Sequence, residues 1–331
     1  METIKAFQIG FSPNVPGALK KFLIDKKKFK PRDLEAAGLV INRGPNVFDR
    51  FAGRVIFPLI DHRGNTVGFA GRILPTEKNT NLAKYINSPE TPIYHKGSFL
   101  YGINLSRSEI KKTSLAVVVE GQLDVISSWQ AGVRNVVATN GTALTEEQLR
   151  FLSRYTDKVI LALDTDFAGD MASRRAIELA SEAALEVKVA EFGDFKDPDE
   201  AARADPEKYK SFLRNAVASW DFVIASIFSK SEVTSGEGKA RVSREIVPVL
   251  ASISDRIVQA HYIELVARKL GSPIEAVSGE ITKFATQRSQ QKPEVVTSAK
   301  IAVKDRRQLL EERLLNLAFG SDPDVLLENN I

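Results

Sequence analysis

Two aspartates one residue apart, Asp164 and Asp166, end the apolar run VILAL and are followed at once by a glycine and a helical pattern. In an extended chain, residues two apart point to the same side, so both carboxylates can face one site. Carboxylates this close repel each other and raise each other's pKa unless a cation offsets them. The chain has no cysteine, and its three histidines lack metal-ligand spacing. We therefore expect a site for a hard cation, Mg²⁺ or Mn²⁺, held by oxygen ligands.

Further carboxylates follow other apolar runs. Glu120 ends the run VVV, Asp124 stands four residues later, and Asp197 and Asp199 lie in DPDE after the run EVKVAEF. Each alone has a plain alternative, because a D-x-D pair is a common capping feature and DPDE suits an ordinary turn that opens a helix. Their joint placement favours convergence on one site. Clustered carboxylates that hold Mg²⁺ suit phosphoryl transfer, in which metal ions polarise the phosphoryl oxygens.

The elements that must position these acids alternate between strand and helix over residues 113–203. Four short apolar runs, LAVVVE, NVVAT, KVILALD and EVKVAEF, are separated by helical patterns, one of which begins after Thr145 as its cap. Such a pattern predicts a parallel sheet that is covered on both faces. Because parallel strands end at one edge of the sheet, the acids should meet there.

The preceding part, residues 1–112, has a net charge of +10, against −6 for the remainder. The stretch RVIFPLIDHRGNTVGFAGRIL predicts a β-hairpin that turns at DHRGN, and PRDLEAAG predicts a helix that ends at Gly38. The loop from Asn79 to Gly102 is rich in polar and aromatic residues and is a candidate for ligand contact. A basic front part suits a polyanionic partner, with a merely solvated surface as the alternative.

The rest of the chain predicts a helical subdomain at residues 204–286, a polar linker at 287–304 and a last helical segment at 305–331. No apolar run is long enough to suggest a membrane span, and the N-terminal residues do not resemble a signal peptide. At 331 residues and 43% hydrophobic content, the chain can bury a large core. These features suit a cytoplasmic protein.

The motifs EGQLDV, ATNGTALTEEQLRFL, LALDTDFAGDMASRRA and DPDE together resemble the Toprim domain of bacterial DnaG-type DNA primases. The upstream stretches FDRFAGRVIFPLIDHRGNTVGFAGRIL and KYINSPETPIYHKGSFLYG are similar to the basic region of the same family. The resemblance implies an α/β and α+β protein. We expect a mixed basic subdomain, a Toprim domain with a central parallel sheet and a helical bundle, with residues 305–331 resembling the start of a helicase-binding domain.

The same resemblance implies DNA-templated synthesis of short RNA primers from ribonucleoside triphosphates, in the bacterial replisome. Single-stranded DNA, nucleoside triphosphates and, for an intact protein, the replicative helicase are the implied partners. The implied metal ligands for Mg²⁺ or Mn²⁺ are Glu120, Asp124, Asp164, Asp166, Asp197 and Asp199. The implied nucleotide or template contacts are Arg50, Arg54, Arg72, Lys84, Asn87 and Lys96. Lys84 joins Glu120, Asp164 and Asp166 as an expected catalytic residue.

The sequence departs from the family pattern at several positions. Ala52 stands where a basic side chain is common, and Gln122 replaces a usual tyrosine. The chain opens almost inside the FQIGFSP element and has no cysteine for a zinc-binding domain, so we expect a primase fragment or a form shortened at both ends, with no zinc site. Two alternatives stay open: a Toprim nuclease or topoisomerase-like enzyme, and a non-catalytic nucleic-acid-binding relative.

Overall fold

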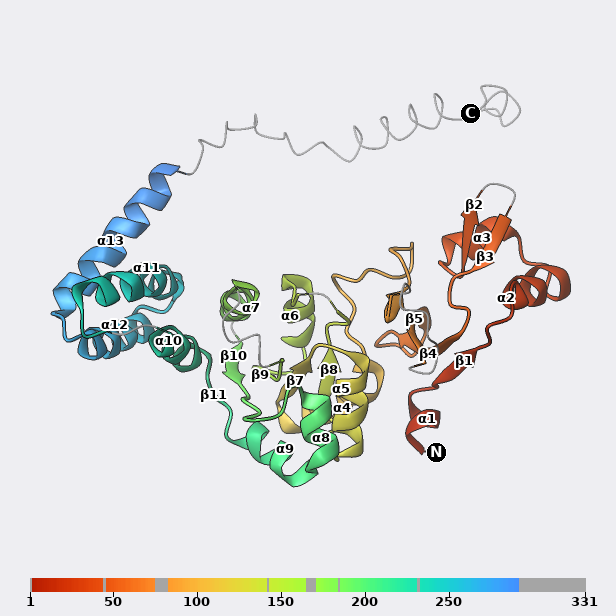
Figure 1. Cartoon of the computed structure of the whole chain (residues 1–331), viewed down its shortest axis with the longest axis horizontal. Helices are drawn as coiled ribbons and strands as arrows, with labels where there is room; N and C mark the ends of the chain where they lie inside the picture. The colour runs from red at the N-terminus through yellow and green to blue at the C-terminus, as the bar shows by residue number, and fades with distance from the viewer. Residues whose placement is uncertain are drawn as a thin grey trace, which may run out of the picture. The chain divides into compact units, whose positions relative to one another are not determined.

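A computed structural model describes residues 2–43, 46–74, 83–141, 143–164, 171–183, 185–230 and 233–291 of the chain (Figure 1). The chain separates into two compact units, Met1–Ser278 and Gly279–Ile331. All elements that position the candidate site belong to the first unit. None of the described helices has both the length and the hydropathy that crossing a membrane requires.

The basic subdomain is built on a four-stranded antiparallel sheet in the order β1-β4-β5-β6. Its strands are β1 (Gly10–Ser12), β4 (Arg54–Ile60), β5 (Thr66–Ile73) and β6 (Tyr85–Asn87). The predicted hairpin is confirmed, since β4 and β5 pair across the DHRGN turn. Asp61 closes this turn, because its Oδ1 accepts the backbone N–H groups of Arg63 at 2.9 Å and Asn65 at 2.8 Å.

Shorter elements surround this sheet. They are α1 (Glu2–Ala6), α2 (Ala18–Lys20), the π-helical turn η1 (Lys21–Lys26), α3 (Pro31–Ala36), β2 (Val40–Arg43) and β3 (Asn46–Asp49). The helix predicted before Gly38 is confirmed as α3. Gly38 has a φ of +68°, and a Cβ there would lie 2.6 Å from Cδ of Pro89, so both the backbone and the packing require glycine.

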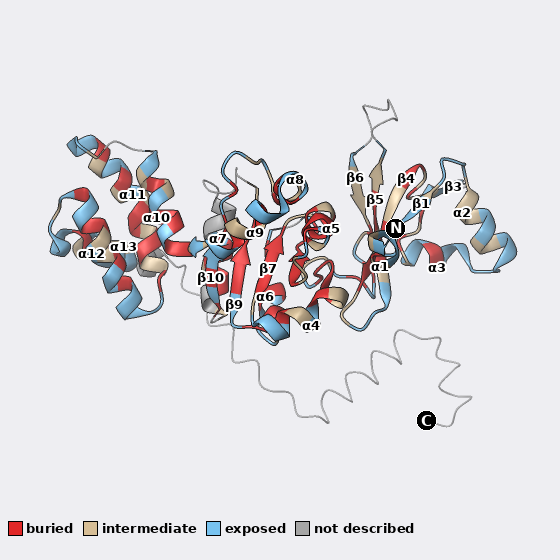
Figure 2. Cartoon of the chain, turned by 90° about the horizontal axis from the view of Figure 1, so that it is seen from below, coloured by how far each residue is buried: buried red, intermediate tan, exposed pale blue. Residues whose placement is uncertain are grey.

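The second sheet has the strand order β11-β10-β9-β7-β8. The strands β7 (Ala116–Val119), β8 (Val136–Ala138), β9 (Lys158–Leu161) and β10 (Glu186–Val189) run parallel, and β11 (Val217–Ala218) pairs antiparallel with β10. The associated helices are α4 (Ile103–Thr113), α5 (Gln122–Gln130), α6 (Glu146–Leu152), α7 (Met171–Glu182), α8 (Pro198–Ala204) and α9 (Pro206–Arg214). Residues of β7, β9 and α5 are mostly buried (Figure 2). The predicted parallel sheet is confirmed.

The cap predicted for α6 is also confirmed. The Oγ1 of Thr145 accepts the backbone N–H of Gln148 at 3.2 Å, and the side chain of Gln148 accepts the backbone N–H of Thr145 at 3.1 Å. This reciprocal pair satisfies two backbone donors at the start of the helix. It also fixes where the chain turns after β8.

The antiparallel edge strand β11 was not predicted. Tyr209 of α9 is fully buried, and its hydroxyl lies 2.6 Å from Oγ of Ser128 in α5. Helix α9 therefore packs against α5 of the parallel-sheet domain, and the predicted boundary at residue 204 stays a prediction. A strand of two residues is too short to show a hydrophobic periodicity, so β11 can be recognised only from its pairing with β10.

The helical part consists of α10 (Ser219–Ser229), α11 (Gly236–Ser252), α12 (Arg256–Leu270) and α13 (Ile274–Gln291). Helix α13 continues into the segment that we expected to be a linker, 287–304. The remainder of that segment and residues 305–331 lie outside the described residues.

The central position of β9 leads to a prediction about stability. Leu161 is fully buried in β9 between β7 and β10, so Leu161→Ala should lower the free energy of unfolding by about 2–5 kcal/mol. Ile257→Ala, at a side chain that is 83% exposed, should change it by about 0.5 kcal/mol or less. Urea denaturation followed by circular dichroism measures both. Equal effects at the two positions would contradict this assignment of the core.

Candidate active site

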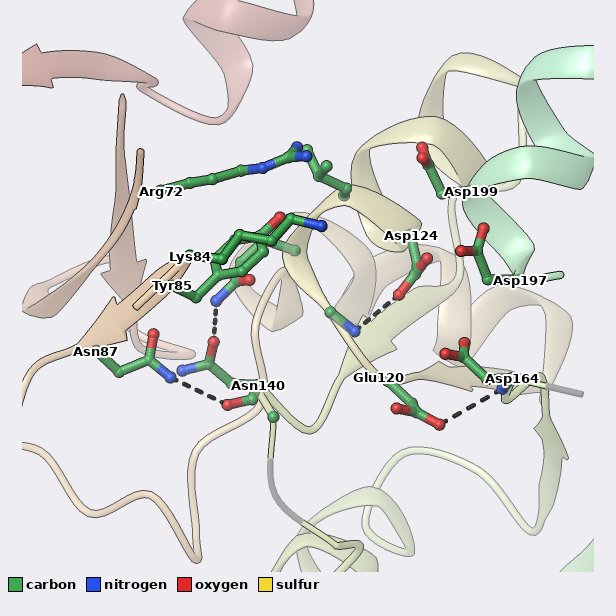
Figure 3. Close-up of a pocket in the computed structure, with 14 residues that line it drawn as sticks. Arg72, Lys84, Tyr85, Asn87, Glu120, Asp124, Asn140, Asp164, Asp197 and Asp199 are labelled. Atoms are coloured by element: carbon green, nitrogen blue, oxygen red, sulfur yellow. Dashed lines mark hydrogen bonds between the residues drawn. The ribbon is translucent and has the colours of Figure 1, made fainter. Parts of the chain in front are cut away.

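A cavity of about 340 Å³ lies where the second sheet meets the β5–β6 edge of the basic subdomain (Figure 3). Its lining combines acidic residues from one side with basic and amide residues from the other. The lining residues are Arg72, Lys84, Tyr85, Asn87, Glu120, Gly121, Gln122, Leu123, Asp124, Asn140, Gly141, Asp164, Asp197 and Asp199. Residues more than 100 positions apart in the chain thus share one cavity.

The acidic residues reach the cavity from the carboxyl ends of parallel strands, as predicted. Glu120 follows β7 and Asp164 follows β9, and the backbone N–H of Asp164 donates to Oε1 of Glu120 at 3.4 Å. Asp124 lies in the first turn of α5. Asp197 and Asp199 stand at the start of α8, which comes after β10. Asp166 falls in residues 165–170, outside the described part of the chain.

Asp124 is the most perturbed of these carboxyl groups. It is only 9% exposed, and its Oδ2 accepts the backbone N–H of Gly121 at 2.8 Å. Burial raises the pKa of Asp124 to about 7, and the charges of Asp164, Asp197 and Asp199 raise it further against the opposing effect of the Gly121 hydrogen bond. Its negative charge is therefore unfavourable here unless a cation approaches.

Asp197 and Asp199 also have structural uses. Oδ1 of Asp197 accepts the backbone N–H of Glu200 at 2.8 Å and so caps α8. Asp199 accepts a hydrogen bond from the hydroxyl of Ser127 and forms an ion pair with Arg203 at 2.9 Å. Both residues were expected to bind metal. Their contacts also fit the alternative given for DPDE, a turn that opens a helix.

The donor set fits a hard divalent cation in kind, because every acidic group in the cavity offers oxygen and none of the described lining residues offers sulfur or imidazole. Among the described residues, no three acidic, histidine or cysteine side chains are grouped closely enough to hold one ion as they stand. Asp166, the missing member of the expected set, is not among those residues. Metal binding by Glu120, Asp164 and Asp166 therefore stays a prediction.

The opposite side of the cavity carries the basic residues. Arg72 comes from β5, Lys84 directly precedes β6, and Tyr85 and Asn87 lie in β6. The guanidinium carbon of Arg72 lies 5.3 Å from the ring centroid of Tyr85, a cation–π contact that helps to hold the arginine in place. In Figure 3, Arg72 and Lys84 extend from this edge toward the side where the carboxylates lie. The structure thus brings three of the six predicted nucleotide contacts to the acids.

The other three predicted contacts are not among the cavity's lining residues. Arg54 is 5% exposed, and its Nη1 donates to the carbonyl oxygens of Gly71 and Lys84, each at 3.3 Å. It therefore supports the backbone that carries Lys84, and a direct nucleotide contact by Arg54 stays a prediction. Arg50 follows β3 and Lys96 lies in the loop after β6. Their proposed nucleotide contacts are likewise untested.

Asn140 is a cavity residue that the sequence reasoning missed. It has a φ of +66° and is 3% exposed, and its backbone N–H donates to the carbonyl of Glu120 at 3.1 Å. Asn87 donates to the carbonyl of Asn140 at 3.2 Å, and Gln122 donates to its Oδ1. The Asn-Gly dipeptide that follows β8 after Thr139 was the available signal, because asparagine tolerates left-handed backbone and often marks a tight turn at a strand end.

This hydrogen-bonded cluster, which we call the Asn140 network, joins the basic subdomain to the second sheet. Nδ2 of Asn140 also donates to the hydroxyl of Tyr94 at 3.0 Å. Burial raises the pKa of Tyr94 to about 12, so this hydroxyl stays protonated at neutral pH. The network therefore fixes the β6 edge against the loops after β7 and β8 with neutral groups.

The fold and the cavity together define a parallel-sheet domain of the Toprim class joined to a basic subdomain. Three family profiles match successive parts of the chain: the N-terminal domain of the DNA primase catalytic core at residues 1–107, a Toprim-like domain at 117–202, and the DnaB-helicase binding domain of primase at 221–275. The third match lies on the described helical part, and the expectation that residues 305–331 begin a helicase-binding domain stays a prediction.

The known proteins that this chain resembles are also DNA primases. The chain is similar to the DNA primase of Clostridium acetobutylicum, at 35% identity over 83% of this chain and 45% of the relative, and to that of Geobacillus stearothermophilus, at 34% over 98% and 53%. Its fold is similar to a DNA primase domain from Pseudomonas aeruginosa, with a TM-score of 0.73, 29% identity and coverage of 85% of this chain and 88% of that one.

A further similar structure is the RNA polymerase domain of Mycobacterium tuberculosis primase in complex with a double-stranded DNA oligomer that has a 6-nucleotide overhang. It has a TM-score of 0.67, 32% identity and coverage of 82% of this chain and 87% of that one. The chain belongs to the family of bacterial DnaG-type DNA primases. It spans about half the length of the curated relatives that it matches.

The buried position of Asp124 leads to a prediction about pH dependence. The folded-state pKa of about 7 lies above the value of about 3.9 for an unfolded aspartate, so the protonated group favours folding and this contribution is lost as pH rises between those values. In EDTA, Asp124→Asn should therefore gain stability over the wild type from pH 4 to pH 8, by at most about 4 kcal/mol. The amide oxygen of the replacement can still accept the Gly121 N–H.

Urea denaturation at several pH values measures this difference. Asp157→Asn is a matched control, because Asp157 is exposed and lies at the opposite end of β9 from Asp164. A difference between Asp124→Asn and wild type that does not change with pH would contradict the prediction.

Proposed function

We propose that this chain is the catalytic core of a primase that joins ribonucleoside triphosphates into short RNA primers on single-stranded DNA. The observation that carries the proposal is the shared cavity, in which Arg72 and Lys84 face the carboxylates of Glu120, Asp124 and Asp164. A nucleoside triphosphate needs cationic groups for its phosphates and a metal-binding site beside its α-phosphorus. The basic side of this cavity suits the phosphates, and the acidic side suits the metal.

In this proposal, Glu120, Asp164 and Asp166 hold Mg²⁺ or Mn²⁺, with Asp124, Asp197 and Asp199 contributing to the acidic surroundings. When bound, the metal lowers the pKa of the attacking hydroxyl and offsets the charge that develops on the phosphate. The raised pKa of Asp124 supports this assignment, because a cation would favour the ionised form of the cluster.

The chain's own residues would orient the substrates. The 3′ hydroxyl of one nucleotide attacks the α-phosphorus of the next, and pyrophosphate leaves toward Lys84 and Arg72, which bind its oxygens. Arg54 holds the backbone carbonyl of Lys84 and so limits where that ammonium group can lie. The Asn140 network joins the β6 edge to the loop after β8, and the backbone N–H of Asn140 in that loop donates a hydrogen bond to the carbonyl of Glu120.

Family membership supports the proposals on template, helicase and location. A solved DnaG primase catalytic domain bound to single-stranded DNA, 29% identical to this chain with a TM-score of 0.68, supports template binding. The match of residues 221–275 to a helicase-binding profile supports a contact with the replicative helicase. Such a protein would act in the cytoplasm, at the bacterial replisome. Contacts to template phosphates carry no base information, so template binding should be weak in sequence preference and sensitive to salt.

The function is tested by incubating the chain with single-stranded DNA, ribonucleoside triphosphates and Mg²⁺ or Mn²⁺. We expect short RNA products, and we expect Asp164→Asn to reduce their rate roughly a hundredfold or more, because it removes a carboxylate ligand. Asp157→Asn should leave the rate unchanged. DNA cleavage without RNA synthesis would favour the nuclease alternative, and binding without any reaction would favour a non-catalytic relative.

Lys84 and Lys96 are predicted to differ, because Lys84 lines the cavity and Lys96 does not. Lys84→Gln removes a charge-assisted contact to phosphate and should raise the KM for nucleoside triphosphate about tenfold or more. Lys96→Gln changes the predicted contact outside this cavity and should raise KM less than Lys84→Gln does. Steady-state kinetics with varied nucleotide concentration provides the measurement. Equal effects of the two substitutions would show that the cavity lining does not identify the triphosphate site.

A further inference from the structure

A second cavity, of about 310 Å³, lies between the β4–β5 turn, the loop after β6 and helix α6. The turn contributes His62 and Arg63, the loop contributes Ile93 and Tyr94, and Phe151 and Arg154 come from α6 and the turn that follows it. No described residue lines both this cavity and the candidate active site. None of the metal ligands or nucleotide contacts expected from the sequence is among its described lining residues.

Two aromatic rings of the lining, those of His62 and Phe151, begin a row that continues outside the cavity to Tyr155. The ring centroids of His62 and Phe151 lie 5.3 Å apart, and those of Phe151 and Tyr155 also lie 5.3 Å apart. Nζ of Lys111 lies 5.2 Å from the centroid of Tyr155. Ile93, which is 63% exposed, adds apolar surface to the lining. The cavity itself therefore offers a flat ligand the rings of His62 and Phe151 beside the apolar side chain of Ile93.

The charge of the cavity is positive. Arg63 and Arg154 are both exposed, and neither guanidinium forms an ion pair with an acidic side chain in the described part of the chain. Asp61 is the one carboxylate among the described lining residues, and the turn itself occupies it. Its Oδ1 accepts two backbone N–H groups, and its Oδ2 accepts Nδ2 of Asn65 at 3.3 Å. Two arginines from different elements therefore remain available to an anionic ligand.

Tyr94 connects this cavity with the candidate active site. Its side chain is 1% exposed, lines the second cavity and packs edge-on against Phe99 at 5.4 Å between ring centroids. Its hydroxyl accepts a hydrogen bond from Asn140, which lines the active-site cavity. The two cavities are therefore separated by little more than one side chain and its hydrogen-bonding partner.

We propose that this second cavity holds a nucleotide of a single-stranded nucleic acid whose neighbouring segment lies at the candidate active site. This inference rests on the proposed function and adds a contact site to it. Arg63 and Arg154 bind backbone phosphates, and a base contacts Phe151 and Ile93. Repeated phosphates separated by planar bases fit two arginines on different walls with apolar surface between them. Because Tyr94 of this cavity is hydrogen-bonded to Asn140 of the active-site cavity, the two cavities lie close enough for neighbouring segments of one strand to occupy them.

The test measures binding of a fluorescein-labelled oligothymidylate by anisotropy, in EDTA and over a range of salt concentrations. The double substitution Arg63→Gln with Arg154→Gln should weaken binding about tenfold. Loss of two phosphate contacts should also reduce the slope of log K against log salt by about 1.4. Arg241→Gln with Arg244→Gln on α11 removes the same charge from an exposed surface elsewhere and should change neither quantity appreciably.

A second variant separates stacking from charge. Phe151→Leu keeps apolar volume but removes the ring, so it should weaken binding about fivefold or more while leaving the salt slope unchanged. Thermal melting of every variant checks that the fold is retained. An oligonucleotide that contains 4-thiothymidine should, after irradiation, form crosslinks to peptides that contain the β4–β5 turn or residues 146–155.

Two outcomes would overturn the inference. The first is wild-type affinity and salt slope in the Arg63 and Arg154 double variant. The second is weakened binding of ATP alone by that variant with unchanged oligonucleotide binding, which would assign the cavity to a free nucleotide. These measurements need neither metal nor synthesis. If the double variant binds the strand more weakly but the wild type makes no primers, only the proposed function is contradicted. If the wild type makes primers and the double variant binds the strand normally, only this inference is contradicted.

Discussion

Several carboxylates are forced together at one edge of a parallel sheet, and the candidate site depends on this constraint. Glu120 and Asp164 leave the sheet at the ends of β7 and β9, and Asp197 begins the helix that follows β10. Because these strands run parallel and are neighbours in the order β10-β9-β7, their acids cannot separate without unfolding the sheet. The electrostatic cost is visible at Asp124, whose pKa is raised to about 7. Burying clustered charge in this way is typical of a site that works with a cation.

The basic subdomain supplies positive charge on the side of the cavity opposite this acidic edge. Its β5–β6 edge brings Arg72 and Lys84 to the cavity, and neutral hydrogen bonds centred on Asn140 hold that edge in place. Neutral groups suit this task, because an ion pair at the junction would compete with phosphate or metal for the same side chains. The buried guanidinium of Arg54 extends the same arrangement, since it fixes the backbone of Gly71 and Lys84. The site is therefore a junction of two sheets, each of which supplies one sign of charge.

The sequence predicted the elements of this site better than it predicted the contacts between them. The hairpin at DHRGN, the helix capped by Thr145 and the parallel sheet all follow from local pattern, and the structure confirms them. The edge strand β11 was missed because two residues have no periodicity of their own. Arg54 and Arg72 look equivalent in the sequence, yet one is buried against carbonyls and the other lines the cavity.

By itself, the sequence determined which side chains stand at the ends of which strands, because residue type and spacing follow directly from the order of the chain. It also determined the family, through motifs that extend over most of the chain. Only the tertiary structure decided which cations meet the acids, which polar groups join the two sheets, and that Tyr94 lies between two cavities. These relations link residues from about 20 to more than 100 positions apart. They depend on how two sheets pack together, and no local pattern of hydrophobic or charged residues records that packing.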